Sequence, residues 1–96
     1  MVMTVLEAIV PLDRLSEVTG VFNEGIKILP PEIISTYLVQ DIKNPALFRL
    51  NTVWKNMEAL EKMRSSGEKP KGIQMFEAVG AKPSLSVFQV VSHNRN

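Results

Sequence analysis

The first ten residues constrain the fold more than any other stretch, because they have the pattern of a β-strand that is apolar on both faces. Successive side chains of a strand point to opposite faces. One alternating set consists of Val2, Leu6, Ala8 and Val10, and the other of Met3, Val5 and Ile9. Pro11 then ends the strand, since proline has no amide hydrogen and a fixed φ angle. Residues 85–91 repeat this two-sided pattern near the end of the chain. Both strands must therefore be covered on two sides.

Turn residues and periodicity predict five elements between these two strands. Apolar residues at steps of three and four predict a helix over 15–29, capped by Asp13. Gly20 and Gly25 weaken this helix, so they either allow close packing or break it near Gly25. The other four elements are strands at 33–42 and 47–54, a helix from 56 to about 64 capped by Asn56, and a short helix at 73–79.

The element order β, α, β, β, α, α, β predicts an α+β fold. This order is typical of a ferredoxin-like, four-stranded antiparallel sheet with helices on one face, and we expect it to occupy residues 1–96 as a single domain. The helices suffice to cover only one face of such a sheet. The apolar second face then predicts a homodimer formed sheet against sheet.

Composition excludes several classes of function. The formal net charge of +1 gives no basic surface for nucleic acid, and no stretch is long and apolar enough to span a membrane. The chain has no cysteine, and its single histidine, His93, lies in the polar tail. We therefore expect no metal site, no cofactor and no nucleophilic triad. A soluble cytoplasmic protein is the default interpretation, with no nucleic acid or membrane as partner.

One segment resembles a known family. Residues 48–61, with the sequence FRLNTVWKNMEALE, are similar to the strand-to-helix segment of the antibiotic biosynthesis monooxygenase family, in which Trp ends the third strand and Glu-Ala-Leu begins the helix. The turn at 41–45 is similar to that family's hairpin linker. The resemblance implies a ferredoxin-like protomer that pairs into a dimeric α+β barrel, often with the last strand reaching across to the partner.

The same resemblance implies a range of activities, which include cofactor-independent oxygenation of aromatic polyketides or quinols, and haem degradation. Many members have a His nine residues after the Trp, where this chain has Met63. Haem-degrading relatives use a His on this helix as the iron ligand and an Asn on the first strand, and this chain has neither. The resemblance therefore argues against haem oxygenation here.

A pocket between the sheet and the helices is the expected site, although the sequence identifies no catalytic residue. The residues expected to shape it are Trp54, Phe22, Met63 and Phe76, with Tyr37 or Thr52 as hydrogen-bonding groups. Each has a structural alternative, since Trp and Met often only fill a core and a strand Tyr is often half-exposed. Glu7 is expected to pair with Arg49 rather than act as a base.

Two functions stay open at this point. The first is a cofactor-independent monooxygenase-like protein that acts on a small aromatic or quinol-type substrate. The second is a non-catalytic dimeric protein of the same fold that binds a small apolar or aromatic ligand or has a stress-related role. Whether the chain is an enzyme is therefore undecided from the sequence, because fold does not fix function.

Overall fold

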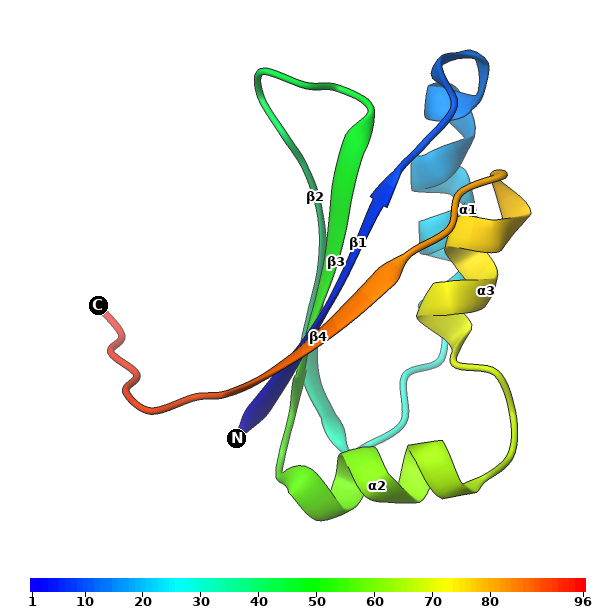
Figure 1. Cartoon of the computed structure of the whole chain (residues 1–96). Helices are drawn as coiled ribbons and strands as arrows, with labels where there is room; N and C mark the ends of the chain where they lie inside the picture. Colours follow the sequence, from blue (N-terminus) through cyan, green and yellow to red (C-terminus); the bar gives the residue numbers. More distant parts are fainter.

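Four antiparallel strands form one sheet in the order β2-β3-β1-β4. The computed structural model describes residues 1–96. The elements along the chain are β1 (Val2–Ile9), the 3-10 helix η1 (Leu12–Glu17), α1 (Val18–Gly25), β2 (Ile33–Gln40), β3 (Leu47–Trp54), α2 (Met57–Ser65), α3 (Lys71–Ala78) and β4 (Ser84–Gln89). All helices lie on one side of the sheet, and the C-terminal tail extends away from it (Figure 1). The predicted ferredoxin-like α+β fold is confirmed.

The first predicted helix differs most from the expectation. It begins as the 3-10 helix η1, whose N-cap position is Pro11, so Asp13 does not cap it. The α-helix proper ends at Gly25, four residues earlier than predicted. A Cβ atom at Gly25 would collide with the Sδ atom of Met75 on α3. Both roles considered for this glycine are thus present, because it ends the helix and lets α1 approach α3.

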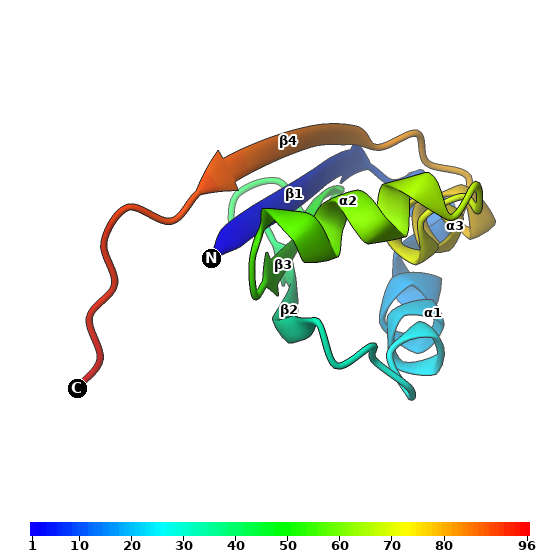
Figure 2. The same cartoon turned by 90° about the horizontal axis from the view of Figure 1, so that it is seen from below.

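The second helix forms as its sequence predicts. Asn56 is the N-cap of α2, and its Oδ1 atom accepts a hydrogen bond of 2.9 Å from the backbone N–H of Ala59. Such a cap satisfies one of the free N–H groups of the first turn. Leu60 and Ala59 face the sheet and are buried. The helix is followed by the loop 66–70, which leads back to α3 (Figure 2).

Side chains on the helix-facing side of the sheet form rows that cross three strands. From one end of the sheet to the other, these rows are Val2, Trp54 and Ile33; Thr4, Thr52 and Thr36; Leu6, Leu50 and Leu38; and Ala8, Phe48 and Gln40. The threonine row therefore interrupts an otherwise mainly apolar surface. It also separates two clusters of buried side chains. The larger cluster lies under α1 and α3 and includes Leu6, Leu50 and Phe76, whereas the smaller consists of Val2, Trp54, Ala59 and Leu60.

The other side of the sheet, which we call the open face, has no helix over it. Apolar side chains there include Met3, Val5, Val53 and Phe88, and Phe88 is 53% exposed. The predicted pair is confirmed, because Glu7 and Arg49 lie opposite each other in the register and form a salt bridge of 2.7 Å. No helix of the chain is long and apolar enough to cross a membrane.

Candidate functional site

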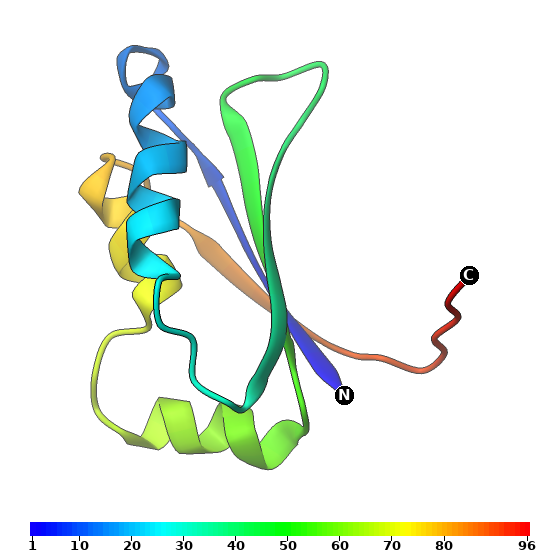
Figure 3. The ribbon, with the colours of Figure 1, turned by 180° about the vertical axis from the view of Figure 1, so that it is seen from behind.

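A cavity of about 550 Å³ lies between the sheet and the helices. One wall comes from β3 and α2, through Trp54, Leu60 and Met63. The opposite wall comes from Leu6 and Leu50 of the sheet and from α3. The mouth is bounded by the connection from α1 to β2, residues 26–30, and by residues 66–72, both visible in Figure 3. A volume of this size is within the range of small-molecule sites in proteins.

The threonine row forms the polar part of the cavity lining. Thr4, Thr52 and Thr36 come from three neighbouring strands and lie in register. The hydroxyl oxygens of Thr36 and Thr52 are 3.0 Å apart and share a hydrogen bond. Thr4 and Thr52 are each only 8% exposed and are the only buried polar residues of the chain. The cavity thus presents buried hydroxyl groups inside an apolar shell.

Trp54 connects the threonine row to the smaller cluster. Its indole Nε1–H donates a hydrogen bond of 3.1 Å to the Oγ1 atom of Thr4 on the neighbouring strand. The ring packs with Val2, Ala59 and Leu60, and only 6% of Trp54 is exposed. A buried Trp normally requires such an acceptor for its N–H group. Trp54 therefore serves as a core residue and as a cavity wall, the two roles that the sequence left open.

Close packing of α3 against the sheet shapes the cavity. Gly72, in the first turn of α3, lies against the sheet, since a Cβ atom there would be 2.6 Å from Leu6 Cδ1 and 2.8 Å from Leu50 Cδ2. This glycine lets α3 start directly on the sheet beside the threonine row. The preceding loop 66–70 then spans the distance to α2, and the space that remains is the cavity.

The mouth of the cavity combines apolar and charged side chains. Ile28 is 81% exposed, and Leu29 beside it is half-exposed. The charged residues of the lining all come from the segment that joins α2 to α3 and its ends: Arg64, Glu68, Lys69 and Lys71. Lys69 is engaged with Glu77 in a salt bridge of 2.9 Å. No charged group lies on the floor, so the interior is uncharged.

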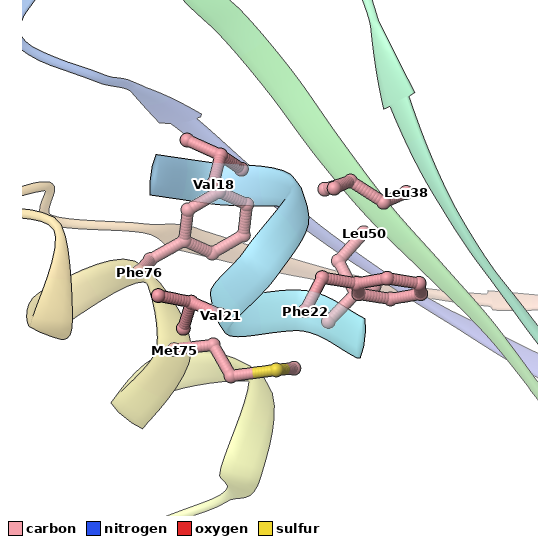
Figure 4. Close-up of a pocket in the computed structure, with 7 residues that line it drawn as sticks. All are labelled: Val18, Val21, Phe22, Leu38, Leu50, Met75 and Phe76. Atoms are coloured by element: carbon pink, nitrogen blue, oxygen red, sulfur yellow. The ribbon is translucent and has the colours of Figure 1, made fainter. Parts of the chain in front are cut away.

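A second pocket, between α1, α3 and the sheet, is too small for a ligand. Figure 4 shows that Phe22 and Phe76 point into it together with aliphatic side chains. Its volume is about 10 Å³, roughly the space of one water molecule. Phe76 belongs to the larger buried cluster, and Phe22 packs against that cluster. These two aromatic residues therefore fill the core at this place.

The structure brings only some of the expected pocket residues together. Trp54, Thr52 and Met63 line the large cavity, whereas Phe22 and Phe76 do not. Tyr37 lies on the open face, opposite Asn51, and is 59% exposed. The reason is an irregularity in the pairing of β2 with β3 between Ile33 and Ser35, which changes the alternation along β2. Tyr37 consequently points away from the cavity.

Sequence reasoning missed Thr4, Thr36 and the segment 26–30 as parts of the cavity. The sequence does contain an indication for Thr4, because it is the one polar residue among Val2, Leu6 and Ala8 on the same face of the strand. The predicted helix over 15–29 includes most of this segment, since Ile26 and Leu29 continue the helical spacing. They are apolar because they border the cavity.

Arg14 and Glu17 form an ion pair on the surface, outside the cavity lining. The guanidinium of Arg14 donates to the Glu17 carboxylate at 3.0 Å, and this hydrogen bond lowers the pKa of Glu17 below its ordinary value. Arg14 also donates to the carbonyl oxygen of Ala78 at 2.9 Å, which ties η1 to the end of α3. This pair contributes to the fold and does not line the cavity.

The residues of the cavity do not fit a haem group. Proteins hold haem iron through His, Cys, Tyr or a Met paired with His. The lining contains none of the first three, and Met63 and Met75 are its only sulfur ligands. His93 lies outside every helix and strand. No group of three or more His, Cys, Asp or Glu side chains is placed to hold a metal ion.

Comparison with known proteins gives structural matches alone. No protein-family model matches the sequence, and no curated protein matches it significantly. A solved antibiotic biosynthesis monooxygenase has a TM-score of 0.72 and 13% identity, covering 96% of this chain and 100% of that one. A solved variant of SnoaB, a cofactor-independent oxygenase from Streptomyces nogalater, matches with a TM-score of 0.68 and 12% identity. The match covers 96% of this chain and 95% of that one. A variant of MhuD with two manganese protoporphyrin IX molecules per active site has a TM-score of 0.75 and 19% identity, with complete coverage of both chains.

At these identities the matches establish the fold. The chain has the fold of the antibiotic biosynthesis monooxygenases over its whole length. The ferredoxin-like protomer fold implied by the sequence resemblance is thereby confirmed.

Proposed function

We propose that the protein binds a small aromatic or quinol-type molecule in the large cavity and oxygenates it without a metal or flavin. The observation that carries this proposal is the cavity of about 550 Å³ itself, with one aromatic wall and a short row of hydroxyl groups inside an apolar shell. Ligand sites commonly have this composition, in which apolar surface supplies affinity and a few polar groups set orientation. Solved monooxygenases of the same fold support the choice of reaction class.

The electrons for this chemistry come from the substrate, so the reaction needs neither a metal nor a flavin. In an anthrone, for example, the enolate form supplies the electrons to dioxygen. One oxygen atom becomes a new ring carbonyl, and the two hydrogens of that carbon leave with the other oxygen atom as water. The substrate is thus the reductant, and the protein contributes desolvation and orientation.

The cavity residues have separate roles in this proposal. Trp54 provides a flat wall against which an aromatic ring stacks, and Met63 adapts to its outline. Thr52, at the centre of the row, is placed to hydrogen-bond a ring oxygen. Phe22, Phe76 and Tyr37 are not part of the site of a single subunit.

The active form in this proposal is a homodimer of two 96-residue domains that associate through their open faces. Exposed apolar side chains on this face, such as Phe88, support the proposal, because contiguous apolar surface is typical of interfaces. A cytoplasmic location is also part of the proposal, and a chain without cysteine is compatible with it.

A non-catalytic ligand-binding protein is the second candidate. The observation that favours it is the floor of the cavity, where the polar groups are threonine hydroxyls and no group can act as a base at neutral pH. The titratable side chains of the lining are all at the mouth. Such a protein would bind the same molecules without consuming dioxygen.

Measurement of dioxygen uptake with anthrones and naphthoquinols tests the proposal. We expect uptake above the buffer rate with the unmodified protein. Ile73→Trp, which fills the cavity from α3, should abolish it. The matched control is Ile42→Trp, since Ile42 is 97% exposed on the β2-β3 hairpin and far from the lining. Ligand-induced thermal stabilisation without uptake would favour the binding protein, and neither effect with any compound would contradict both functions.

A further inference from the structure

The threonine row has more hydrogen-bond donors than the protein uses. Thr4, Thr52, Thr36 and the indole of Trp54 together hold four donor hydrogens. Two hydrogen bonds are formed among them, one from Trp54 to Thr4 and one between Thr36 and Thr52. None of the three hydroxyls forms a hydrogen bond to a backbone carbonyl. Two hydroxyl hydrogens therefore remain without an acceptor in the protein.

The position of each spare donor follows from these bonds. Thr4 uses its oxygen as the acceptor for Trp54, so its own hydrogen is free. In the pair of Thr36 and Thr52 one hydroxyl donates and the other accepts, so one hydrogen of this pair is free. Both free hydrogens belong to residues that line the cavity.

Within the sheet, the neighbouring rows offer no side-chain acceptor for these hydrogens. On one side the row is bounded by Val2, Trp54 and Ile33, and on the other by three leucines, Leu6, Leu50 and Leu38. A buried donor without an acceptor is costly, whereas a spare lone pair costs less. A ligand oxygen that accepts hydrogen bonds therefore gains more at this row than a hydrocarbon of the same shape.

We propose that Thr4, Thr52 and Thr36 are the specificity-determining residues of the cavity, and that they select planar aromatic molecules with a hydrogen-bond-accepting ring oxygen, a carbonyl or a phenolate. This inference rests on the proposed function, since it assumes that the cavity binds aromatic ligands. Trp54 donates a hydrogen bond to Thr4, which is at one end of the row, and its ring forms the cavity wall beside the row. A ligand stacked on Trp54 thus has its oxygen next to the spare donors.

The shared hydrogen bond gives this proposal a distinctive signature. Thr52→Val frees the hydroxyl of Thr36, and Thr36→Val frees that of Thr52, so each single variant keeps one spare donor. The double variant Thr36→Val/Thr52→Val has none at this position. The preference for an accepting oxygen should therefore survive each single change and fall only in the double variant. Thr4 is left intact because the indole of Trp54 depends on it.

The test compares two probes of nearly equal shape, 1,4-naphthoquinone and 1,4-dimethylnaphthalene. Binding is followed by the resonance of the indole N–H in two-dimensional NMR spectra, which is unique because Trp54 is the only tryptophan. The chain has no cysteine, so the quinone forms no thioether with it. Thr36→Ser/Thr52→Ser is the matched control, because it keeps both hydroxyls and removes two methyl groups. The remaining resonances report whether each variant is folded.

We expect the unmodified protein to bind the quinone about threefold to tenfold more tightly than the hydrocarbon, the effect of about one hydrogen bond. Each single valine variant and the serine control should keep this ratio within about twofold. The double valine variant should lower it by more than about twofold without weakening hydrocarbon binding, and the hydroxyl hydrogen of Thr4 accounts for the preference that remains. If both probes bind but the double valine variant leaves the ratio unchanged, the threonine proposal is wrong and the ligand-binding cavity stands. If neither probe binds the unmodified protein, both proposals are overturned.

Discussion

At the scale of single residues, the hydrogen bond between Trp54 and Thr4 is the contact on which the cavity depends most. It joins β3 to β1 inside the protein, and both residues are more than nine-tenths buried. The acceptor fixes the ring plane of Trp54, since the indole N–H must point at Thr4. The orientation of the cavity wall therefore follows from a residue on a different strand.

Replacement of this acceptor should destabilise the protein measurably. Thr4→Val keeps the shape of the side chain but leaves the indole N–H of Trp54 without a partner, so we expect the free energy of unfolding to fall by about 1–3 kcal/mol. Urea denaturation measures this loss. In a Trp54→Phe background the same change removes no hydrogen bond and should cost much less. Equal losses in the two backgrounds would show that the hydrogen bond is not the cause.

The sequence predicted side-chain positions well wherever a strand alternates without interruption. In β3, Trp54 and Thr52 face the helices while Arg49 and Asn51 face the other way, as their spacing indicates. Tyr37 could not be placed in the same way, because the irregularity between Ile33 and Ser35 shifts the alternation in β2. Such an irregularity depends on pairing with β3 and leaves no clear local pattern.

At the scale of elements, the approach of α3 to the sheet sets the size of the cavity. Gly72 is the residue that allows this approach, because its missing side chain leaves room for Leu6 and Leu50. Gly20, in the first turn of α1, is different, since nothing lies within 4 Å of the position of its absent Cβ atom. A side chain at position 72 would therefore collide with the sheet, whereas a side chain at position 20 would meet nothing.

Alanine at these two positions should have opposite effects. We expect Gly72→Ala to lower the free energy of unfolding by about 1–3 kcal/mol through overpacking against the sheet. Gly20→Ala should raise it by about 0.5–1 kcal/mol, because alanine restricts the unfolded chain and favours the helix. Thermal or urea denaturation of the two variants compares them directly. If Gly72→Ala raised the free energy of unfolding, α3 would be able to move away from the sheet without a loss of stability.

Element boundaries were predictable where a cap or a proline marks them, as at Asn56 and Pro11. The end of α1 was not, because Ile26 and Leu29 continue the helical spacing into the connection that follows. These residues are apolar for a different reason, since they border the cavity. Periodicity alone cannot separate side chains that face a core from side chains that face a binding site.

At the scale of the whole molecule, the open face exposes apolar side chains that no helix covers. It carries exposed aromatic and aliphatic side chains, an ion pair and the buried Asn51 oxygen without a partner. Contiguous apolar patches of this kind are typical of interaction sites. The two-sided apolar pattern of β1 predicted this face from the sequence. The sequence could not predict that the Asn51 oxygen has no partner, because this depends on how the strands pair.

The proposed dimer predicts a result in solution. The unmodified protein should have twice the chain mass of 10.7 kDa by light scattering at micromolar concentration. Val5→Lys places a charge in the middle of the open face, between Asn51 and Ser86, and should give a monomer. Ile42→Lys, on the exposed hairpin, is the control and should remain dimeric. A monomeric unmodified protein would contradict the dimer.

The threonine row also separates the buried side chains into two clusters, and we expect the elements that each cluster holds to open separately. α2 is held by the small cluster of Val2, Trp54, Ala59 and Leu60, while α1 and α3 share the larger one. In native-state hydrogen exchange we expect the amides of α2 to exchange through local opening, at a lower free energy than those of β1 and β3. Uniform protection across α2 and the sheet would contradict this. The cavity is lined by residues of both clusters, so a bound molecule should contact both. Its binding should therefore slow hydrogen exchange of the α2 amides, towards the rates of the sheet amides.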